Sequence, residues 1–296
     1  MYSAECDVKK ALELEKHLID KYRFLRRFVI ARTILDRRIV SFTLGRAGLL
    51  LAGAFHGSER ITAMMLYRFL DEVCERMDND HSFYNTVVSI GLTVIPMVNP
   101  DGVEISCNGV STAKKNAELV SECLIKSGLH HRKWQANARG VDINHNFNAG
   151  YEEVKRKERE LGIIAESPTR YGGEYAESER ETKALCELCR NNNYTVAVAL
   201  HSQGREIYYD YGDNTPEISR TLAEQMAHLS GYTVSRPQGV AVGGGFKDWF
   251  IERFSRPAFT IEVGKGENPL SPDMFFSEYP LVSKMLNRLL DYAVNN

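Results

Sequence analysis

The chain has 296 residues, of which 43% are hydrophobic and 26% are charged, and its formal net charge is −2. This length and composition suit one α/β domain with a sizeable core, and the near-neutral charge argues against a general nucleic-acid binder or a protein of anionic membrane surfaces. No apolar run approaches the roughly 20 residues of a membrane-spanning helix. The first seven residues contain acids where a signal peptide has bases, so we expect a cytoplasmic protein.

The six cysteines are scattered along the chain, which is unlike a disulfide framework and fits a reducing compartment. Cys186 and Cys189 have the spacing of half a zinc finger. No second Cys or His pair accompanies them, and they lie in a helical pattern. We therefore predict two packed helix cysteines rather than a metal site.

The chain begins with one helical pattern and three strand patterns. Apolar residues recur at helical intervals over residues 7–24, and residues 28–34 and 38–44 are rich in β-branched and aromatic side chains. The run 49–54 is apolar on both faces, which is typical of a strand in the middle of a sheet that is covered on both sides. A site is expected at the carboxyl end of such a strand.

His56 and Glu59 follow that strand directly, at a spacing that places both side chains on one side of a turn or helix start. An imidazole nitrogen and a carboxylate oxygen are ligands that zinc takes in catalytic sites. Two further candidates, His201 and Glu262, end later apolar runs. Alone, His201 could be a buried core histidine and Glu262 a partner of an arginine, but their joint placement at strand ends favours a metal site.

The rest of the chain alternates helical and strand patterns. Asn99-Pro100-Asp101-Gly102 is a strong turn signal, and Ser178 with Glu181 predicts a capping box for the helix through Cys189. The remaining predicted helices are 61–73, 112–125, 246–254, one after Thr215-Pro216-Glu217 and one from 271 to about 292, and the predicted strands are 91–98, 194–200 and 258–263. This order predicts a single α/β domain with helices on both faces of its sheet.

Five motifs in this order resemble the zinc carboxypeptidases of the carboxypeptidase A type, over roughly residues 45–292. They are His56-x-x-Glu59, Asn99-Pro100-Asp101-Gly102, Gly140-Val141-Asp142-Ile143-Asn144-x-Asn146-Phe147, His201-Ser202 and Thr260-Ile261-Glu262. The resemblance implies a mixed, mostly parallel twisted sheet of about eight strands with helices on both faces. It also implies that residues 45–296 form the zinc peptidase core and that residues 1–44 add a helix and strands to the same domain. It also implies that His56, Glu59 and His201 bind one zinc ion per chain, that Asp142 orients His56, and that Glu262 is the general base.

The chain departs from this family at the residues that contact substrate. His145 follows Asn144 where family exopeptidases have an arginine that binds the terminal carboxylate of the substrate. Gln135, beside Trp134, stands where the family has an arginine for the oxyanion. Arg139 and Arg132 are alternative donors for that role, and the sequence does not choose between them.

A subgroup of the family fits better. His201-Ser202-Gln203-Gly204, Gly243–Trp249 and Thr260–Leu270 resemble the bacterial γ-D-glutamyl-diamino acid peptidases, which cut between D-glutamate and meso-diaminopimelate. In the wider family, the position of Lys247 faces the side chain after the cut bond, so this lysine would suit the distal carboxylate of diaminopimelate. An exposed helix charge is the ordinary interpretation of Lys247.

The resemblance therefore implies hydrolysis of a small soluble muropeptide by a zinc peptidase. Two alternatives are a carboxypeptidase acting on other peptides, including glutamylated ones, and a metal-free binding module of the same fold. The joint presence of His56, Glu59, His201 and Glu262 disfavours the binding module. The sequence predicts neither the oligomeric state nor whether the action is endo- or exopeptidase.

Overall fold

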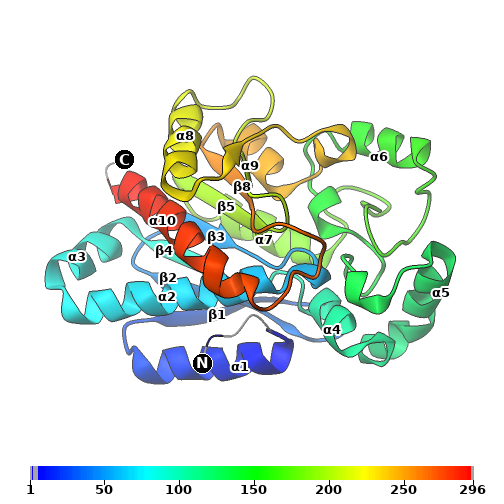
Figure 1. Ribbon diagram of the computed structural model, residues 1–296, viewed down its shortest axis with the longest axis horizontal. Coiled ribbons are helices and arrows are strands. Elements are labelled where there is room, and N and C mark those ends of the chain that lie inside the picture. Colours follow the sequence, from blue (N-terminus) through cyan, green and yellow to red (C-terminus); the bar gives the residue numbers. More distant parts are fainter. Residues whose placement is uncertain (1, 3–5, 295–296) are drawn as a thin grey trace.

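The computed structural model describes Tyr2 and residues 6–294, apart from the side chain of Val240. The prediction about a signal peptide concerns residues that lie largely outside this part. One sheet of eight strands crosses the molecule in the order β1-β2-β4-β3-β5-β8-β6-β7 (Figure 1). The strands are β1 (Arg26–Arg32), β2 (Arg38–Leu44), β3 (Leu49–Ala52), β4 (Leu92–Ile95), β5 (Val196–His201), β6 (Glu206–Tyr208), β7 (Thr233–Val234) and β8 (Ala258–Glu262).

The centre of the sheet is parallel and its flanks are mostly antiparallel. Strands β4, β3, β5 and β8 run in one direction, whereas β1, β2 and β6 pair antiparallel to their inner neighbours. Every residue of β3, β4 and β5 is buried, as expected of strands with both faces covered. The predicted mixed, mostly parallel sheet in one α/β domain is confirmed.

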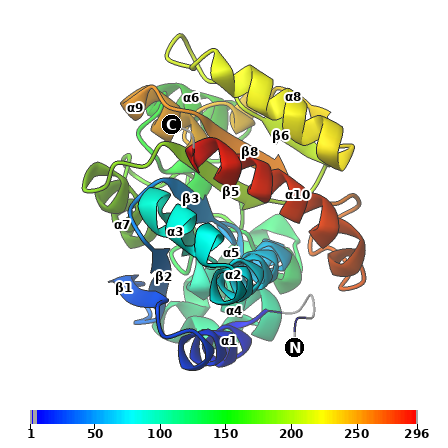
Figure 2. The same ribbon diagram turned by 90° about the vertical axis from the view of Figure 1, so that its left-hand side faces the viewer.

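Helices cover both faces of the sheet, and the pleat of β3 separates the two cores. Leu49 and Leu51 belong to a core with residues of α1, α2, α3, α8 and α10, whereas Leu50 and Ala52 face a second core with α7 and α9 (Figure 2). The first group comprises α1 (Val8–Lys21), α2 (Ile61–Asn79), α3 (His81–Ile90), α8 (Ile218–Ser230) and α10 (Met274–Val294). The second comprises α7 (Arg180–Arg190), which buries Cys186 and Cys189, and α9 (Phe246–Phe254).

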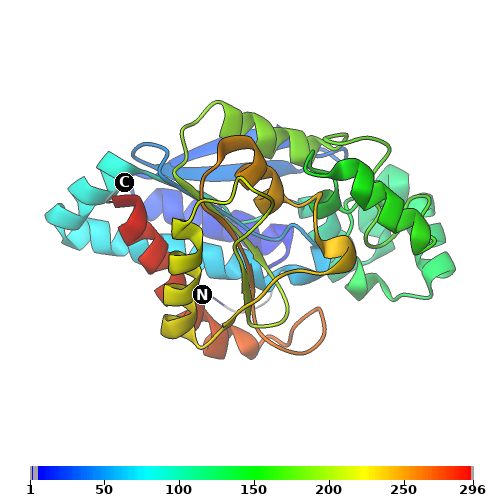
Figure 3. The same cartoon turned by 90° about the horizontal axis from the view of Figure 1, so that it is seen from above.

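A third group of helices lies at the end of the molecule where β3 leads into His56. It contains α4 (Pro100–Asn108), α5 (Ala117–Ser127) and α6 (Tyr151–Glu160), which gather at the same end in two views (Figures 1 and 3). A small core around Trp134 joins α4 to α5. In the part of the chain that is described, no helix is both long and apolar enough to span a bilayer.

A predicted turn and a predicted helix cap differ from the structure. The turn predicted at Asn99 is the start of α4, because the Asn99 side chain accepts a hydrogen bond from the Gly102 N–H and Pro100 occupies the first helical position. The capping box predicted for Ser178 and Glu181 is wrong. Helix α7 begins at Arg180 without a side-chain cap, and the Ser178 hydroxyl instead donates to Glu179 at 2.8 Å.

Candidate active site

The ends of three neighbouring parallel strands deliver the predicted site residues to one place. Strand β3 leads to His56 and to Glu59, which lies in a 3-10 turn at Gly57–Glu59. Strand β5 ends at His201 and β8 ends at Glu262, and these two residues are partners in the register of the sheet. The structure therefore brings together side chains that are far apart in the sequence.

The turn that carries His56 and Glu59 is pressed against helix α4. A Cβ atom on Gly57 would lie 2.2 Å from the Gly102 carbonyl oxygen, so no other residue fits there without movement. The Gly57 N–H donates to the Gln135 carbonyl at 3.0 Å, and the Asn99 amide donates to the Phe55 carbonyl at 3.0 Å. These contacts fix the position of the turn relative to the next strand.

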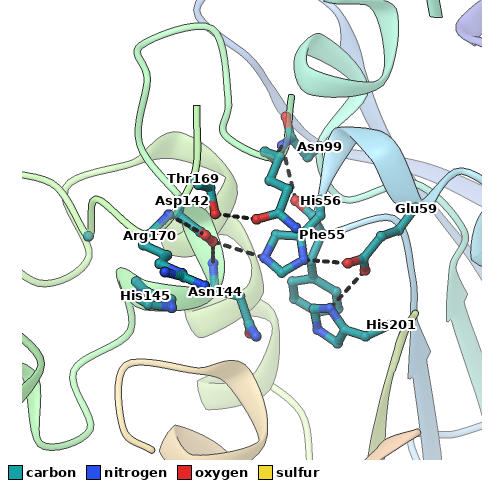
Figure 4. Close-up of polar contacts among 12 residues, drawn as sticks. Phe55, His56, Glu59, Asn99, Asp142, Asn144, His145, Thr169, Arg170 and His201 are labelled. Carbon is teal, nitrogen blue, oxygen red and sulfur yellow. Dashed lines mark hydrogen bonds and ion pairs between the residues drawn. The ribbon is translucent and has the colours of Figure 1, made fainter. Parts of the chain in front are cut away.

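His56, Glu59 and His201 form a compact cluster of donor atoms (Figure 4). Nδ1 of His56 lies 2.8 Å from one carboxylate oxygen of Glu59, and Nδ1 of His201 lies 3.0 Å from the other. One ligand atom from each residue lies within 4.8 Å of the others. Two imidazole nitrogens and one carboxylate oxygen are a donor set that catalytic zinc takes, with a fourth position left for water or substrate. The residues present therefore fit a zinc ion.

The charges in this cluster favour an ionised ligand carboxylate. Burial alone would raise the pKa of Glu59, but the imidazoles of His56 and His201 outweigh it and lower that pKa to about 2. Burial lowers the pKa of His201, which favours the neutral imidazole that a metal requires. The Asn268 amide donates to Glu59 at 3.2 Å and to the Ser202 carbonyl at 2.6 Å, so the carboxylate is also held in place.

Asp142 orients the ring of His56. Its Oδ1 lies 3.0 Å from Nε2 of His56 and accepts the Asn144 N–H at 3.1 Å, while Oδ2 accepts the Arg170 N–H at 2.9 Å. Against the effect of burial, the neighbouring imidazoles of His56 and His145 hold the pKa of Asp142 well below its usual range. An ionised Asp142 accepts the proton on Nε2 of His56 and so turns Nδ1 toward Glu59, where it is the nitrogen that could bind a metal.

Glu262 reaches a cavity of about 630 Å³ that is also lined by His56, Glu59 and Asp142. Its side chain is only partly exposed, and burial together with the negative charge of Glu59 raises its pKa well above the usual range. A carboxylate with a raised pKa is a better proton acceptor near neutral pH. The position of Glu262 beside the ligand cluster is therefore suited to general-base chemistry.

The comparisons with known proteins agree with this geometry. A sequence model of the zinc carboxypeptidase family matches residues 26–286. The chain belongs to the zinc carboxypeptidase family. It is 32% identical over 277 residues to γ-D-glutamyl-L-diamino acid endopeptidase 1 of Lysinibacillus sphaericus. The aligned region covers 89% of this chain and 67% of that protein.

Two solved structures show the same fold. Bovine thrombin-activatable fibrinolysis inhibitor superposes with a TM-score of 0.78 at 17% identity, over 100% of this chain and 99% of that one. Murein-tripeptide amidase MpaA from Escherichia coli O157 has a TM-score of 0.53 at 23% identity, over 89% and 91% of the two chains. Membership of the zinc carboxypeptidase family makes this protein a metallopeptidase, and it implies zinc at the His-Glu-His cluster.

Two of the residues predicted to contact substrate line the cavity, namely Gln135 and His145. The Gln135 side chain accepts a hydrogen bond from the Thr169 hydroxyl. His145 is largely buried, with Nδ1 3.4 Å from Glu158. The Asn144 side chain accepts the Phe246 N–H at 3.1 Å and so connects this loop to the start of α9.

The other predicted contacts, Asn144, Arg139, Arg132 and Lys247, are not among the residues that line the cavity. Arg139 is partly exposed and lies 3.8 Å from buried Glu179. The Lys247 side chain is buried in α9, where its ammonium donates to Asp248 and, at 2.6 Å, to the Asp210 carbonyl. A contact of Lys247 with substrate remains a prediction, and the structure directs its ammonium to protein partners.

Tyr208 and Arg170 are among the residues of the cavity lining that sequence reasoning missed. The Tyr208 hydroxyl donates to Glu206 at 2.5 Å, and Glu206 is the register partner of Glu262. A polar alternation in residues 206–208 after an apolar strand was the available signal for Tyr208. No pattern identifies Arg170, because its loop has neither helical nor strand periodicity.

Proposed function

We propose that this protein hydrolyses the amide bond between the γ-carboxyl of D-glutamate and meso-diaminopimelate in small peptides derived from peptidoglycan, with one zinc ion per chain. The observation that carries the substrate class is the 32% identity to a γ-D-glutamyl-L-diamino acid endopeptidase over 89% of the chain. The zinc peptidase chemistry is supported independently by the His56, Glu59 and His201 cluster beside Glu262.

Five polar residues of the site have a role in this proposal. His56, Glu59 and His201 would hold the zinc ion, and Asp142 would keep Nδ1 of His56 turned toward it. When bound, zinc would supply a Lewis acid that acidifies water and polarises the carbonyl of the bond to be cut. Glu262 would take the proton of the attacking water and pass it to the leaving amine of diaminopimelate.

The shape and polarity of the cavity suit a small charged peptide. Its lining includes the cationic groups of Lys133 and Arg170 as well as the carboxylates of Glu262 and Glu267. A γ-D-glutamyl-diaminopimelate peptide carries carboxylates, which can pair with the cationic groups of the cavity, and an amine, which can pair with its carboxylates. Lys133 and Glu267 already pair with each other at 2.9 Å, so Arg170 and Glu262 are the groups for which an apolar substrate offers no partner.

A defined set of muropeptides tests the proposal. Purified protein is incubated with L-Ala-γ-D-Glu-meso-diaminopimelate, with the lysine analogue, and with ordinary peptides that have a free C-terminus, and products are identified by mass spectrometry. We expect L-Ala-D-Glu and free diaminopimelate. Cleavage of ordinary peptides alone would favour a general carboxypeptidase, and no bound zinc with no cleavage would favour a binding module.

A further inference from the structure

Asn268 reaches the ligand cluster from the loop that follows β8. Its partly exposed side chain lines the cavity beside Glu59. The amide nitrogen donates to Oε1 of Glu59 at 3.2 Å and to the Ser202 carbonyl at 2.6 Å, and the amide oxygen accepts the Ser202 hydroxyl at 2.8 Å. One side chain therefore contacts both a predicted metal ligand and the residue that follows a second ligand, His201.

The contacts of Asn268 determine which end of its amide faces Glu59. The Ser202 carbonyl and the Glu59 carboxylate are both acceptors, so the group that contacts them is the amide NH2, which is a donor. The amide oxygen is then free to accept the Ser202 hydroxyl. A leucine of similar size would fill the same space but would offer Glu59 no hydrogen bond.

The hydrogen bonds of Glu59 differ in whether a bound metal would displace them. Nδ1 of His56 and Nδ1 of His201 contact the carboxylate at 2.8 and 3.0 Å, and a metal would take both nitrogens. A nitrogen that binds a metal carries no proton, so it can no longer donate to Glu59. The Ser202 N–H at 3.3 Å and the Asn268 amide at 3.2 Å do not compete with the metal. These two donors therefore remain to orient the carboxylate when a metal is bound.

The neighbouring loops are held together by backbone contacts that do not involve the Asn268 side chain. Strands β5 and β8 pair in register, and the Gly204 N–H donates to the Gly264 carbonyl at 2.8 Å just beyond them. These bonds connect the loops that follow both strands. They supply no donor for the Glu59 carboxylate. The contact with Glu59 is therefore the feature of Asn268 that a purely structural role leaves unexplained.

We propose that Asn268 is a positioning residue for the metal ligand Glu59, and that its amide raises the affinity of the cluster for zinc. The hydrogen bond holds the carboxylate in one orientation, so less conformational freedom is lost when the metal binds. Outer contacts of this kind commonly change metal affinity by about 10- to 100-fold. The inference rests on the proposed function for the identity of the metal, and it assigns Asn268 no contact with the reacting atoms.

Zinc affinity and metal-free stability, measured on the same variants, test the inference. The zinc dissociation constant is obtained by competition with a chromophoric chelator for the wild type, Asn268→Leu and Asn268→Ala. Ser202→Ala removes the hydroxyl that contacts Asn268 but keeps both of these donors to Glu59. Asn192→Ala is the matched control, because its amide donates to the Leu188 carbonyl but is exposed and outside the cavity lining. Denaturant unfolding in excess chelator gives the metal-free stability, and cleavage of L-Ala-γ-D-Glu-meso-diaminopimelate is followed on the zinc-loaded proteins.

We expect the zinc dissociation constant of Asn268→Leu to be about 10- to 100-fold higher than that of the wild type. Asn268→Ala should lose less affinity, because water can replace the amide, Ser202→Ala less still, and Asn192→Ala none. Unchanged affinity in both Asn268 variants, an equal loss in Ser202→Ala, or a loss that follows metal-free stability across the variants would overturn the inference alone. If these differences are found but the muropeptide stays uncut, the proposed function fails and the inference holds. A wild type that binds no zinc would overturn both.

Discussion

The neighbours of two glutamates in one cavity shift their pKa values in opposite directions. Glu59 is flanked by two imidazoles, which lower its pKa to about 2, whereas burial and the charge of Glu59 raise the pKa of Glu262. Carboxylates whose environments separate their pKa values in this way commonly divide the roles of ligand and base. The sequence predicts these two roles for Glu59 and Glu262, and both remain predictions.

Glu262→Gln should separate catalysis from metal binding. The amide keeps the size of the side chain and is not a predicted zinc ligand, so we expect zinc content equal to that of the wild type and kcat lower by roughly 100-fold or more. Zinc content by elemental analysis and kcat on the cleaved peptide are measured on the same preparation. Turnover near the wild-type value would remove Glu262 from the mechanism.

Lys247→Met tests whether the ammonium of Lys247 stabilises the fold by pairing with Asp248 or contacts the substrate. Lys247 and Asp248 are 4% and 3% exposed, and burial raises the pKa of Asp248. Removing the lysine would leave that carboxylate buried without its cation, so we expect a loss of about 3 kcal/mol in the free energy of unfolding. Denaturant unfolding measures the loss. Normal stability with a reduced preference for diaminopimelate over lysine would instead support the substrate contact that the sequence predicts.

At the scale of helices and strands, the sequence predicted the elements that a local pattern of apolar residues defines. The bounds of α9, residues 246–254, agree with the structure, and β3 lies within the predicted run 49–54. Helix α3 was missed because it starts at His81, immediately after its cap Asp80, where the polar residues also end α2. The place of Arg170 and the contact of Lys247 with the Asp210 carbonyl could not be predicted, because loop paths and long-range backbone contacts fix them.

Gly57→Ala tests the close contact between the ligand turn and α4. The added Cβ would lie 2.2 Å from the Gly102 carbonyl oxygen, so the turn must move and carry His56 and Glu59 with it. We expect a loss of about 3 kcal/mol or more in the free energy of unfolding and weaker zinc binding. Gly162→Ala is the control, because a Cβ there meets no atom within 4 Å and only its φ of +75° is unfavourable. A Gly57→Ala protein as stable as the control would contradict this account.

Helix α7 contains a buried acid whose ionisation should affect stability. Glu181 is 1% exposed, and burial, with the negative charges of Asp101 and Glu179 adding to it, raises its pKa to about 8. Because the folded protein holds this proton more tightly than the unfolded chain, the contribution of Glu181 is fully present below about pH 4.5 and is lost as the pH rises through about 8.

Glu181→Gln cannot lose a proton, so its stability relative to the wild type should be higher at pH 8.5 than at pH 5. We expect a difference of at least about 1 kcal/mol between the two conditions. Thermal unfolding at both pH values measures it. Exposed Glu187→Gln on the same helix is the control, and a parallel response of both variants would show that Glu181 ionises normally.

At the scale of the whole molecule, the sheet order explains why the site could be predicted from the sequence. Strands β3, β5 and β8 are neighbours and parallel, so their carboxyl ends meet and bring His56, His201 and Glu262 together. The motifs at these strand ends are therefore visible in the sequence. The same topology links three distant chain segments at one point, which makes metal binding a constraint on the whole fold.

Removal of zinc should therefore lower the stability of the entire domain. A ligand that binds only the folded state at 100 to 1,000 times its dissociation constant stabilises that state by about 2.7 to 4.1 kcal/mol. We expect a chelator to lower the Tm of the wild type by several degrees. His201→Ala removes one of the three ligands, so its Tm should be low already and insensitive to chelator, whereas exposed His228→Ala should respond as the wild type does. A chelator response retained in His201→Ala would place the metal elsewhere.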